Sequence, residues 1–198
     1  RNIWRRRLPR GWARRLTRHS ADDFDPAVKA DGSGLVFVST RRDAKGDLYL
    51  LSLAKPGQPR RLTGVEHGER EPDWFPDGQR LAYVRTSHGA SDGIFLLNLK
   101  DGSSRRLSAR PGHQPAVSPD GSLLVFVAAS AERHAGRPCL WLQRFSDGRE
   151  WPLGECTAPV GFPAWMRLQE QYWLVYSRFA DDSNADGRLD TADRPSLW

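Results

Sequence analysis

The sequence predicts an all-β protein, a segment of a β-propeller, and three observations carry that prediction. A Leu or Ile followed by an aromatic residue recurs at intervals of 45, 46, 46 and 57 residues. Runs of Leu, β-branched and aromatic residues alternate with Asp-Gly turns, and no stretch shows helical periodicity. Four short strands repeated about every 45 residues are typical of the four-stranded antiparallel blades of a propeller. The recurring pairs are Ile3-Trp4, Leu48-Tyr49, Ile94-Phe95, Leu140-Trp141 and Leu197-Trp198.

Each repeat unit contains the same four elements in the same order. The first is a strand that contains a proline, as at 72–74, and the second is a hydrophobic run, as at 81–83. An Asp-Gly pair between them, as at 77–78, predicts a tight turn because Gly adopts positive φ without a steric cost. The Leu/Ile-aromatic pair marks the third strand, and Arg-Leu-Thr or a variant, as at 61–63, marks the fourth. In the last unit, residues 166–169 replace the Asp-Gly turn.

The repeats divide the chain into one half blade, three complete blades and one partial blade. The chain therefore begins inside one blade and ends inside another, so we expect a segment of a longer protein. The rest of a larger propeller would then lie outside it, and the alternative is a small four-bladed ring closed by the two ends. The expected boundaries are a half blade at 1–17, blades at 18–63, 64–108 and 109–157, and a partial blade at 158–198.

Large aromatic residues recur where neighbouring blades would meet. A single blade cannot bury both of its faces, so stacked blades are expected to bury these rings between them, each contributing roughly 1.5–3 kcal/mol. The expected core aromatics are Trp74, Tyr83, Phe95, Phe126, Trp141, Trp165 and Tyr176.

Two turn sequences carry a resemblance to a known family. Ser118-Pro119-Asp120-Gly121 and its variant Phe75-Pro76-Asp77-Gly78 are each followed by a Leu-containing strand, then by the aromatic pair and the Arg-Leu-Thr sequence. This arrangement resembles the TolB-like, WD-repeat-like propeller family and covers nearly the whole chain. The resemblance implies a propeller fold, a periplasmic location and a role in protein binding.

The positive charge of the chain is concentrated near its start. Residues 1–15 hold seven arginines and no acidic residue, and the rest of the 30 basic side chains nearly balance the 24 acidic ones. Such a cluster is compatible with a site for phosphate, nucleic acid or an anionic lipid surface. The alternative, a solvated pair of strands, is favoured, so nucleic acid is not the expected partner. No stretch of about 18 apolar residues is present, so no transmembrane segment is expected in this chain.

The two cysteines flank a predicted hairpin. A two-residue turn at Asp147-Gly148 would place Cys139 opposite Cys156 and Gln143 opposite Pro152, with the cysteine Cα atoms about 4.5 Å apart. We therefore expect a Cys139–Cys156 disulfide, and the alternative is a pair of reduced buried thiols. A disulfide would indicate an oxidising compartment, in agreement with a periplasmic or otherwise exported protein.

Residues 182–193 match the twelve-residue calcium loop that has Asp or Asn at positions one, three and five and Gly at position six. The sequence looks like the loop shared by EF-hand and dockerin proteins, with Asp in place of the final Glu and with strands as its flanks. An acidic solvated loop is the alternative. We expect a structural Ca²⁺ here, although a regulatory role stays open. The expected ligands are Asp182, Asn184, Asp186, the Arg188 carbonyl, Asp190 and Asp193.

One mouth of the central channel is the expected place for a binding site. Asp25, Glu71 and Gln114 precede equivalent prolines on first strands, and first strands are the innermost strands of a propeller. Solvated loop ends are the alternative. Three histidines on neighbouring loops have irregular offsets, so the metal ligation known for oligogalacturonate lyases is disfavoured. They are His19, His67 and His113.

The sequence favours a binding role over a catalytic one. It contains no Gly-x-Ser-x-Gly elbow, and its serines lie in predicted turns, so we expect no Ser/His/Asp catalytic set. The main hypothesis is a non-catalytic, calcium-stabilised periplasmic propeller that binds a protein or peptide. The alternative is the propeller portion of an enzyme, either a gate of a prolyl-oligopeptidase-type peptidase or a polysaccharide lyase.

Overall fold

The computed structural model describes residues 1–198 except 55–57, 65, 131–135, 155, 180–195 and 198. All regular structure in the described part of the chain is β, which confirms the predicted class. The strands are β1 (Trp4–Arg6), β2 (Ala13–Arg15), β3 (Asp23–Val28), β4 (Gly34–Ser39), β5 (Asp47–Ser52), β6 (Arg60–Arg61), β7 (Gly68–Trp74), β8 (Arg80–Ser87), β9 (Ala90–Asn98), β10 (Ser104–Arg106), β11 (His113–Val117), β12 (Leu123–Ala129), β13 (Pro138–Arg144), β14 (Glu150–Pro152), β15 (Val160–Leu168), β16 (Gln171–Arg178) and β17 (Ser196–Leu197).

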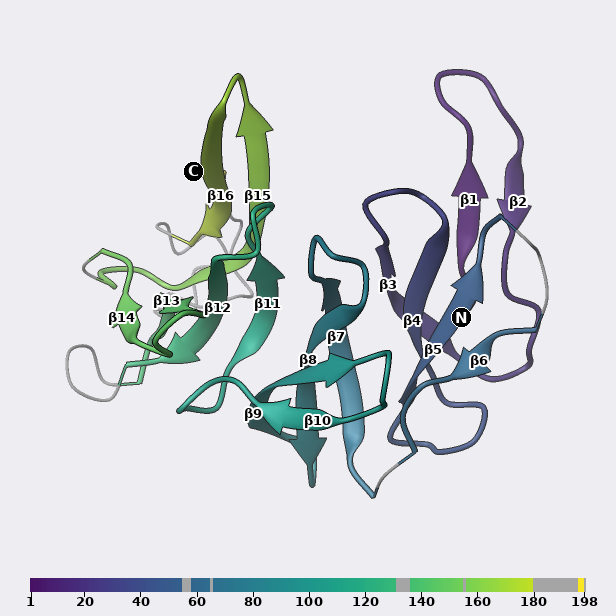
Figure 1. The fold of residues 1–198 in the computed structure, drawn as a ribbon, viewed down its shortest axis with the longest axis horizontal. Helices are drawn as coiled ribbons and strands as arrows, with labels where there is room; N and C mark the ends of the chain where they lie inside the picture. The colour runs from purple at the N-terminus through teal and green to yellow at the C-terminus, as the bar shows by residue number, and fades with distance from the viewer. Residues whose placement is uncertain (55–57, 65, 131–135, 155, 180–195, 198) are drawn as a thin grey trace, which may run out of the picture.

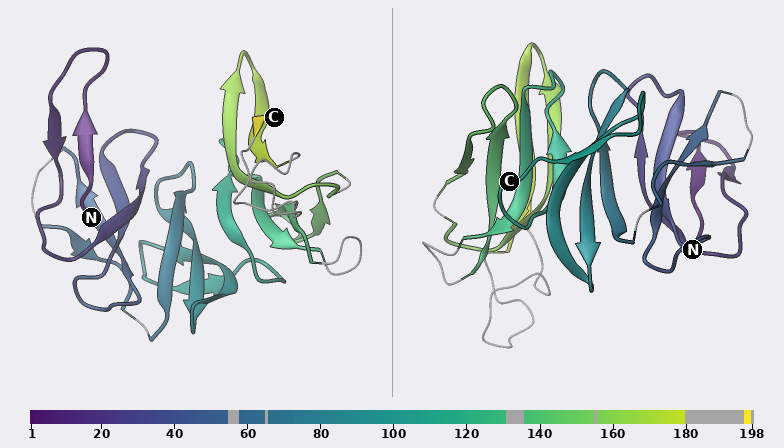
Figure 2. Two further views of the ribbon diagram at one scale, coloured as in Figure 1. Left: turned by 180° about the vertical axis from the view of Figure 1, so that it is seen from behind. Right: turned by 60° about the horizontal axis from the view of Figure 1, so that its bottom comes forward.

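The strands form five separate antiparallel sheets that follow one another along an open arc (Figure 1). Three of these sheets have four strands, in the orders β3-β4-β5-β6, β7-β8-β9-β10 and β11-β12-β13-β14. The end sheets are β1-β2 and β15-β16-β17, and both views of Figure 2 place β1-β2 and β15-β16 at opposite ends of the arc. Because the end sheets do not combine into a fourth blade, the chain is a partial propeller rather than a closed small ring.

The core lies in the seams between neighbouring sheets, as expected for radial packing. One cluster joins the second and third four-stranded sheets around Phe75, Phe126 and Trp141, and another joins the first and second around Trp74 and Tyr83. Five of the seven expected core aromatics are buried. The other two, Trp165 and Tyr176, are half-buried, because the last sheet has a neighbour on one side only.

The expected tight turns are present and share one mechanism. Gly32, Gly78 and Gly121 have φ between 60° and 72°, the left-handed region that favours glycine. In each turn the preceding aspartate accepts a hydrogen bond from the backbone N–H two residues further on. In the last sheet β15 and β16 extend further instead, and the turn falls at Gln169 and Glu170.

A hydroxyl joins the third strand of a blade to the end of the fourth in three of the five sheets. Thr17, Thr63 and Ser108 accept hydrogen bonds of 2.9–3.0 Å from the N–H groups of Ile3, Leu48 and Ile94, respectively. The β11–β14 sheet has Gly154 at the equivalent position. There, the predicted disulfide links Cys139 on β13 to Cys156, with Cα atoms 5.2 Å apart.

The predicted register behind that disulfide is wrong by two residues. Pro152 pairs with Trp141 rather than with Gln143, because the hairpin loop has four residues, Phe145–Gly148, instead of two. The Gly148 N–H donates to the Arg144 carbonyl at 2.9 Å, and of the two turn residues only Gly148 has positive φ. A two-residue type I′ turn needs positive φ at both central positions, which explains the longer loop. Cys156 therefore reaches Cys139 from beyond the end of β14.

The described residues contain no helix of the length and apolar character that would be needed to cross a membrane.

Candidate binding site at the channel mouth

The first strands of four successive sheets line one groove. β3 contacts β7, β7 contacts β11, and β11 contacts β15, so the innermost strands form the concave side of the arc. The groove has a volume of about 730 Å³. Its wall contains Asp25, Glu71, Asp73, Gln114, Phe162 and Trp165, together with Pro26, Pro72, Pro115, Pro119 and Pro163 and small apolar residues between them.

Each of these inner strands has a β-bulge at the residue before its proline. The register shifts between Phe24 and Ala27 in β3, and equivalent shifts occur in β7, β11 and β15. The bulged residues have φ of 48–54°, a left-handed conformation that is rare for residues other than Gly. Such conformations cost of order 1–3 kcal/mol each and are concentrated at functional sites. The four bulged residues are Asp25, Glu71, Gln114 and Phe162.

The bulged residues are connected by a hydrogen-bond relay that crosses from sheet to sheet. Asp25 Oδ2 accepts from the Glu71 N–H at 3.1 Å, and Glu71 Oε2 accepts from the Gln114 N–H at 2.5 Å. Gln114 Oε1 in turn accepts from the Phe162 N–H at 2.6 Å. In three of the four bulges, at Glu71, Gln114 and Phe162, the backbone N–H therefore donates to the side chain of the bulged residue in the preceding sheet. The relay ends at Phe162, whose side chain cannot accept and is 61% exposed.

Two tryptophans join the same inner strands. The indole N–H of Trp74 donates to the Ala27 carbonyl of the preceding sheet at 3.0 Å, and that of Trp165 donates to the Ala116 carbonyl at 3.0 Å. In the intervening seam the Val117 N–H donates to Asp73 Oδ2 at 2.8 Å. Hydrogen bonds between side chain and backbone therefore link each pair of neighbouring sheets around the groove.

The groove is acidic. Asp25, Glu71 and Asp73 line it, and its lining contains no Lys or Arg among the described residues. Burial raises the pKa of Asp73, while backbone hydrogen bonds from Val117 and Trp74 act in the opposite direction. Asp25 and Glu71 each use one oxygen in the relay. In the described part of the chain the second oxygen of each has no hydrogen-bond partner, so it is available to a ligand.

The structure brings the three predicted rim residues, Asp25, Glu71 and Gln114, into one wall, but a binding role for them stays a prediction. Phe162 and Asp73 complete that wall and were not predicted. Phe162 precedes Pro163, the fourth member of the proline series, so the repeat itself contained the signal. Asp73 had no such signal, because Ala occupies the equivalent position in the other inner strands.

The expected calcium ligands at 182–193 lie outside the described residues, so the structure does not test them. Among the residues it describes, no three His, Cys, Asp or Glu side chains are grouped as metal ligands. His19 and His67 take local partners: His19 Nδ1 accepts from the Ala21 N–H, and His67 Nδ1 contacts Ser87 Oγ.

One serine, one histidine and one aspartate lie close together, although the sequence did not single them out as a group. Ser87 Oγ donates to Asp92 Oδ2 at 2.6 Å. His67 Nδ1 lies 2.9 Å from Ser87 Oγ and 3.8 Å from Asp92 Oδ2. His67 and Ser87 line a second groove of about 590 Å³. In a nucleophilic triad the imidazole lies between the serine and the carboxylate, whereas here the serine lies between the other two. The turn at His88-Gly89, with positive φ at both residues, brings Ser87 close to Asp92, and the pairing of β7 with β8 places His67 beside Ser87.

Comparisons with known proteins agree with this architecture. The model of the TolB beta propeller domain family matches residues 1–169. A putative TolB from Agrobacterium tumefaciens superposes with a TM-score of 0.71 and 18% identity over 90% of this chain and 63% of that one. TolB from Acinetobacter baumannii superposes with a TM-score of 0.65 and 17% identity, over 89% of this chain and 46% of that protein. An oligogalacturonate lyase in complex with manganese superposes with a TM-score of 0.65 and 16% identity, over 96% of this chain and 56% of that protein.

The chain thus spans less than two thirds of the length of each of these proteins. At such identities the likeness shows a shared fold. No curated protein matches the sequence.

Proposed function

The chain belongs to the TolB beta propeller domain family, and on that basis we propose that it is a non-catalytic, exported binding module whose inner groove takes a peptide segment of a protein partner. The observation that carries this proposal is the relay from Asp25 to Phe162. It holds two carboxylates and a glutamine in fixed positions around a concave wall.

The chemistry of the wall specifies what kind of peptide would bind. The second oxygens of Asp25 and Glu71 suit the guanidinium or ammonium group of Arg or Lys. The prolines and the exposed ring of Phe162 offer apolar contact beside them. We therefore expect a segment in which a basic residue lies next to an aliphatic or aromatic one. Because the positively charged side chain enters an acidic groove, affinity should fall as salt concentration rises.

The test uses short synthetic peptides that pair Lys or Arg with Leu or Phe, with the reversed-charge peptides containing Glu as the reference. The key variant is Glu71→Gln, because the amide oxygen of Gln still accepts the Gln114 N–H while the charge is removed. We expect Glu71→Gln to weaken basic peptides about three- to tenfold without unfolding the chain. Glu170→Gln, an exposed acid outside the groove, is the matched control. Equal affinity of the wild type for basic and acidic peptides, or an unchanged affinity in Glu71→Gln, would refute the proposal.

An enzymatic role is the second candidate, because the similar folds include a lyase. If the enzymatic role is hydrolysis, the side chains to test are His67, Ser87 and Asp92. An activity-based fluorophosphonate probe that labels the wild type and not Ser87→Ala would favour the enzyme. The serine-centred order of these three groups is the reason that we rank this candidate second.

The calcium loop at 182–193 belongs to the proposal on the evidence of its sequence. Asp182, Asn184, Asp186 and Asp193 supply oxygen ligands at the spacing that Ca²⁺ loops use, and Gly187 permits the turn. Titration calorimetry should detect Ca²⁺ binding to the wild type and a loss of that signal in Asp186→Ala. Identical heats from the two proteins would remove calcium from the proposal.

Export is the third part of the proposal, and the Cys139–Cys156 disulfide supports it, since such bonds persist in oxidising compartments. Mass spectrometry of non-reduced peptides from the protein made in its native cell should find the two cysteines linked. Two free thiols would contradict export.

A further inference from the structure

We propose that the β1–β2 hairpin is a docking element for anionic phospholipid membranes, with its arginines contacting lipid phosphates and Leu8 and Trp12 entering the headgroup region. This inference does not depend on the peptide groove, which lies on the inner strands. The hairpin is the segment 4–15, with β1 paired to β2 from Trp4↔Arg15 to Arg6↔Ala13. Figure 1 shows it projecting beyond the sheet next to it.

The hairpin repeats β9–β10 residue for residue, which makes its differences informative. Trp4 pairs with Arg15 as Phe95 pairs with Arg106, and the Arg10-Gly11 turn corresponds to Asp101-Gly102. By the same alignment, Arg5 and Arg6 occupy the positions of Leu96 and Leu97. Both leucines are buried. The hairpin thus has arginine where the ordinary blade has core leucine and a turn aspartate.

These arginines are not suited to a blade core. Burying a guanidinium without a counter-charge is strongly unfavourable, so an apolar neighbouring sheet would not cover them. Arg5, Arg6, Arg7, Arg10 and Arg14 are all exposed, and none of them forms an ion pair with a described residue. No carboxylate among the described residues therefore neutralises the charge of the hairpin, and an anionic partner would do so.

The base of the hairpin is anchored while its end is free. Ile3 and Leu16 pack into the apolar cluster of Leu35, Phe37 and Tyr49, and the Thr17 hydroxyl holds Ile3. This anchorage presents the rest of the hairpin as a projecting unit rather than as a loose terminus.

The loop at the end of the hairpin identifies a membrane as the partner. Leu8 is 78% exposed and Trp12 is 97% exposed, and Arg6 Nε donates to the Gly11 carbonyl at 2.9 Å, which closes the loop that carries both. Tryptophan prefers the membrane interface, and apolar insertion combined with a basic patch gives stable peripheral binding where either one alone is weak. Stacking on nucleic-acid bases would use Trp12 but would give the aliphatic Leu8 no role.

The experiment is co-sedimentation of the full chain with vesicles of phosphatidylcholine that contain one third phosphatidylglycerol, or none. We expect binding to the anionic vesicles only, with a loss on raising the salt concentration. Removing two positive charges in Arg10→Gln/Arg14→Gln should reduce partitioning about 25-fold, since each arginine near an anionic surface contributes about fivefold. Trp12→Ser, which introduces the residue found at the equivalent position 103, should reduce it about tenfold.

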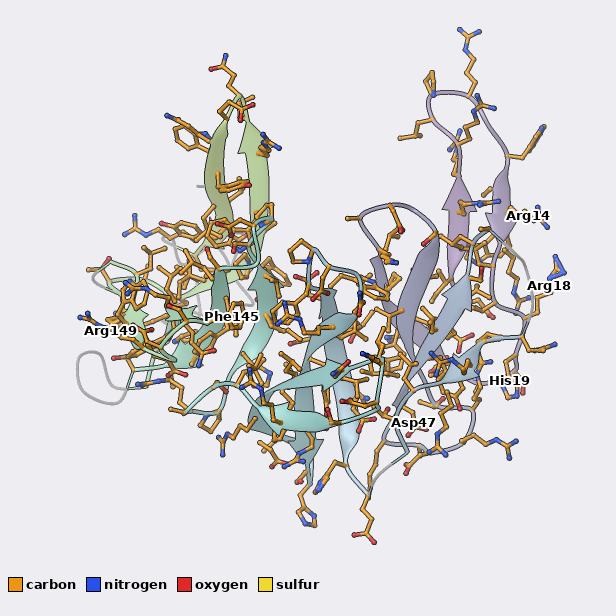
Figure 3. The ribbon with its side chains drawn as sticks, in the orientation of Figure 1. Arg14, Arg18, His19, Asp47, Phe145 and Arg149 are labelled. Carbon is orange, nitrogen blue, oxygen red and sulfur yellow. A yellow bond between two sulfur atoms is a disulfide. The ribbon has the colours of Figure 1, made fainter. Side chains whose placement is uncertain are left out.

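The matched control is Arg105→Gln/Arg149→Gln. Arg105 is the structural equivalent of Arg14, and Figure 3 places Arg14 and Arg149 at opposite ends of the molecule. This control should bind as the wild type does. Three results would overturn the proposal: an equal loss in the control, unchanged partitioning of Trp12→Ser, or tighter binding to duplex DNA that is insensitive to Trp12→Ser.

Discussion

Glu69 is a buried acid whose titration should make the stability of the protein depend on pH. It lies on β7 with a fully buried side chain, and its Oε2 accepts a hydrogen bond of 2.8 Å from Thr63 of the preceding blade. Its other oxygen has no hydrogen-bond partner. Burial raises the pKa of Glu69 to about 7, the Thr63 hydrogen bond opposes this rise, and the charge of buried Asp47 adds to it. Arg61, paired with Asp47 at 2.8 Å and 39% exposed, compensates only in part.

The sign and size of the effect follow from this pKa. The folded state holds a proton on Glu69 that the unfolded chain, with a pKa near 4.5, has already released. The contribution of this bound proton to the free energy of unfolding is therefore complete below pH 4.5. It is lost as the pH rises to about 7, and it stays lost at higher pH. At 1.36 kcal/mol for each unit of pKa, the loss amounts to about 3 kcal/mol.

The perturbation is Glu69→Gln, which keeps an oxygen for Thr63 but cannot ionise. Urea unfolding of wild type and variant should be measured from pH 4.5 to 8, because other groups titrate equally in both proteins and cancel in the difference. We expect the variant to gain about 3 kcal/mol relative to the wild type across this range. A difference in the free energy of unfolding that does not change with pH, or that changes in favour of the wild type as the pH rises, would contradict this prediction. It would show that Glu69 ionises normally and that the blade seam is not a low-dielectric site.

Three further predictions concern the ties between strands and blades. Replacing Cys139 and Cys156 by Ser should lower the free energy of unfolding by about 3 kcal/mol in urea titrations, because the bond closes a loop of 17 residues; an unchanged midpoint would contradict this. Gln114→Ala removes the acceptor for the exposed Phe162 N–H and should cost about 0.5–1.5 kcal/mol, whereas Gln114→Glu keeps an acceptor and should cost less; equal losses would count against the relay. Ser108→Ala leaves the buried Ile94 N–H without a partner and should cost about 1–3 kcal/mol by thermal unfolding, with the exposed Ser103→Ala as the control; similar melting curves for the two would be evidence against the tie.

The local pattern of the sequence was sufficient to place most of the strands. Alternating apolar residues, Asp-Gly turns such as Asp77-Gly78 and the recurring Leu/Ile-aromatic pair are each determined within a few residues of the chain. Because these signals recur at a nearly constant interval, they also predicted the blades and the aromatic seams. The one clear error of register, at Asp147-Gly148, arose because an Asp-Gly pair fits both a two-residue and a four-residue loop.

The sequence by itself therefore determined the repeat, the strand content and the burial of five of the seven seam aromatics, because each depends on spacing along the chain. The disulfide was predicted correctly, but from a register that was wrong by two residues. Only the tertiary structure decided how one blade meets the next. The relay through Asp25, Glu71 and Gln114, the raised pKa of Glu69 and the convergence of His67 with Ser87 and Asp92 all join residues of different strands, and the relay and Glu69 join different blades. Such contacts depend on the angle and offset between neighbouring strands and sheets, which the packing of side chains sets and which no local pattern encodes.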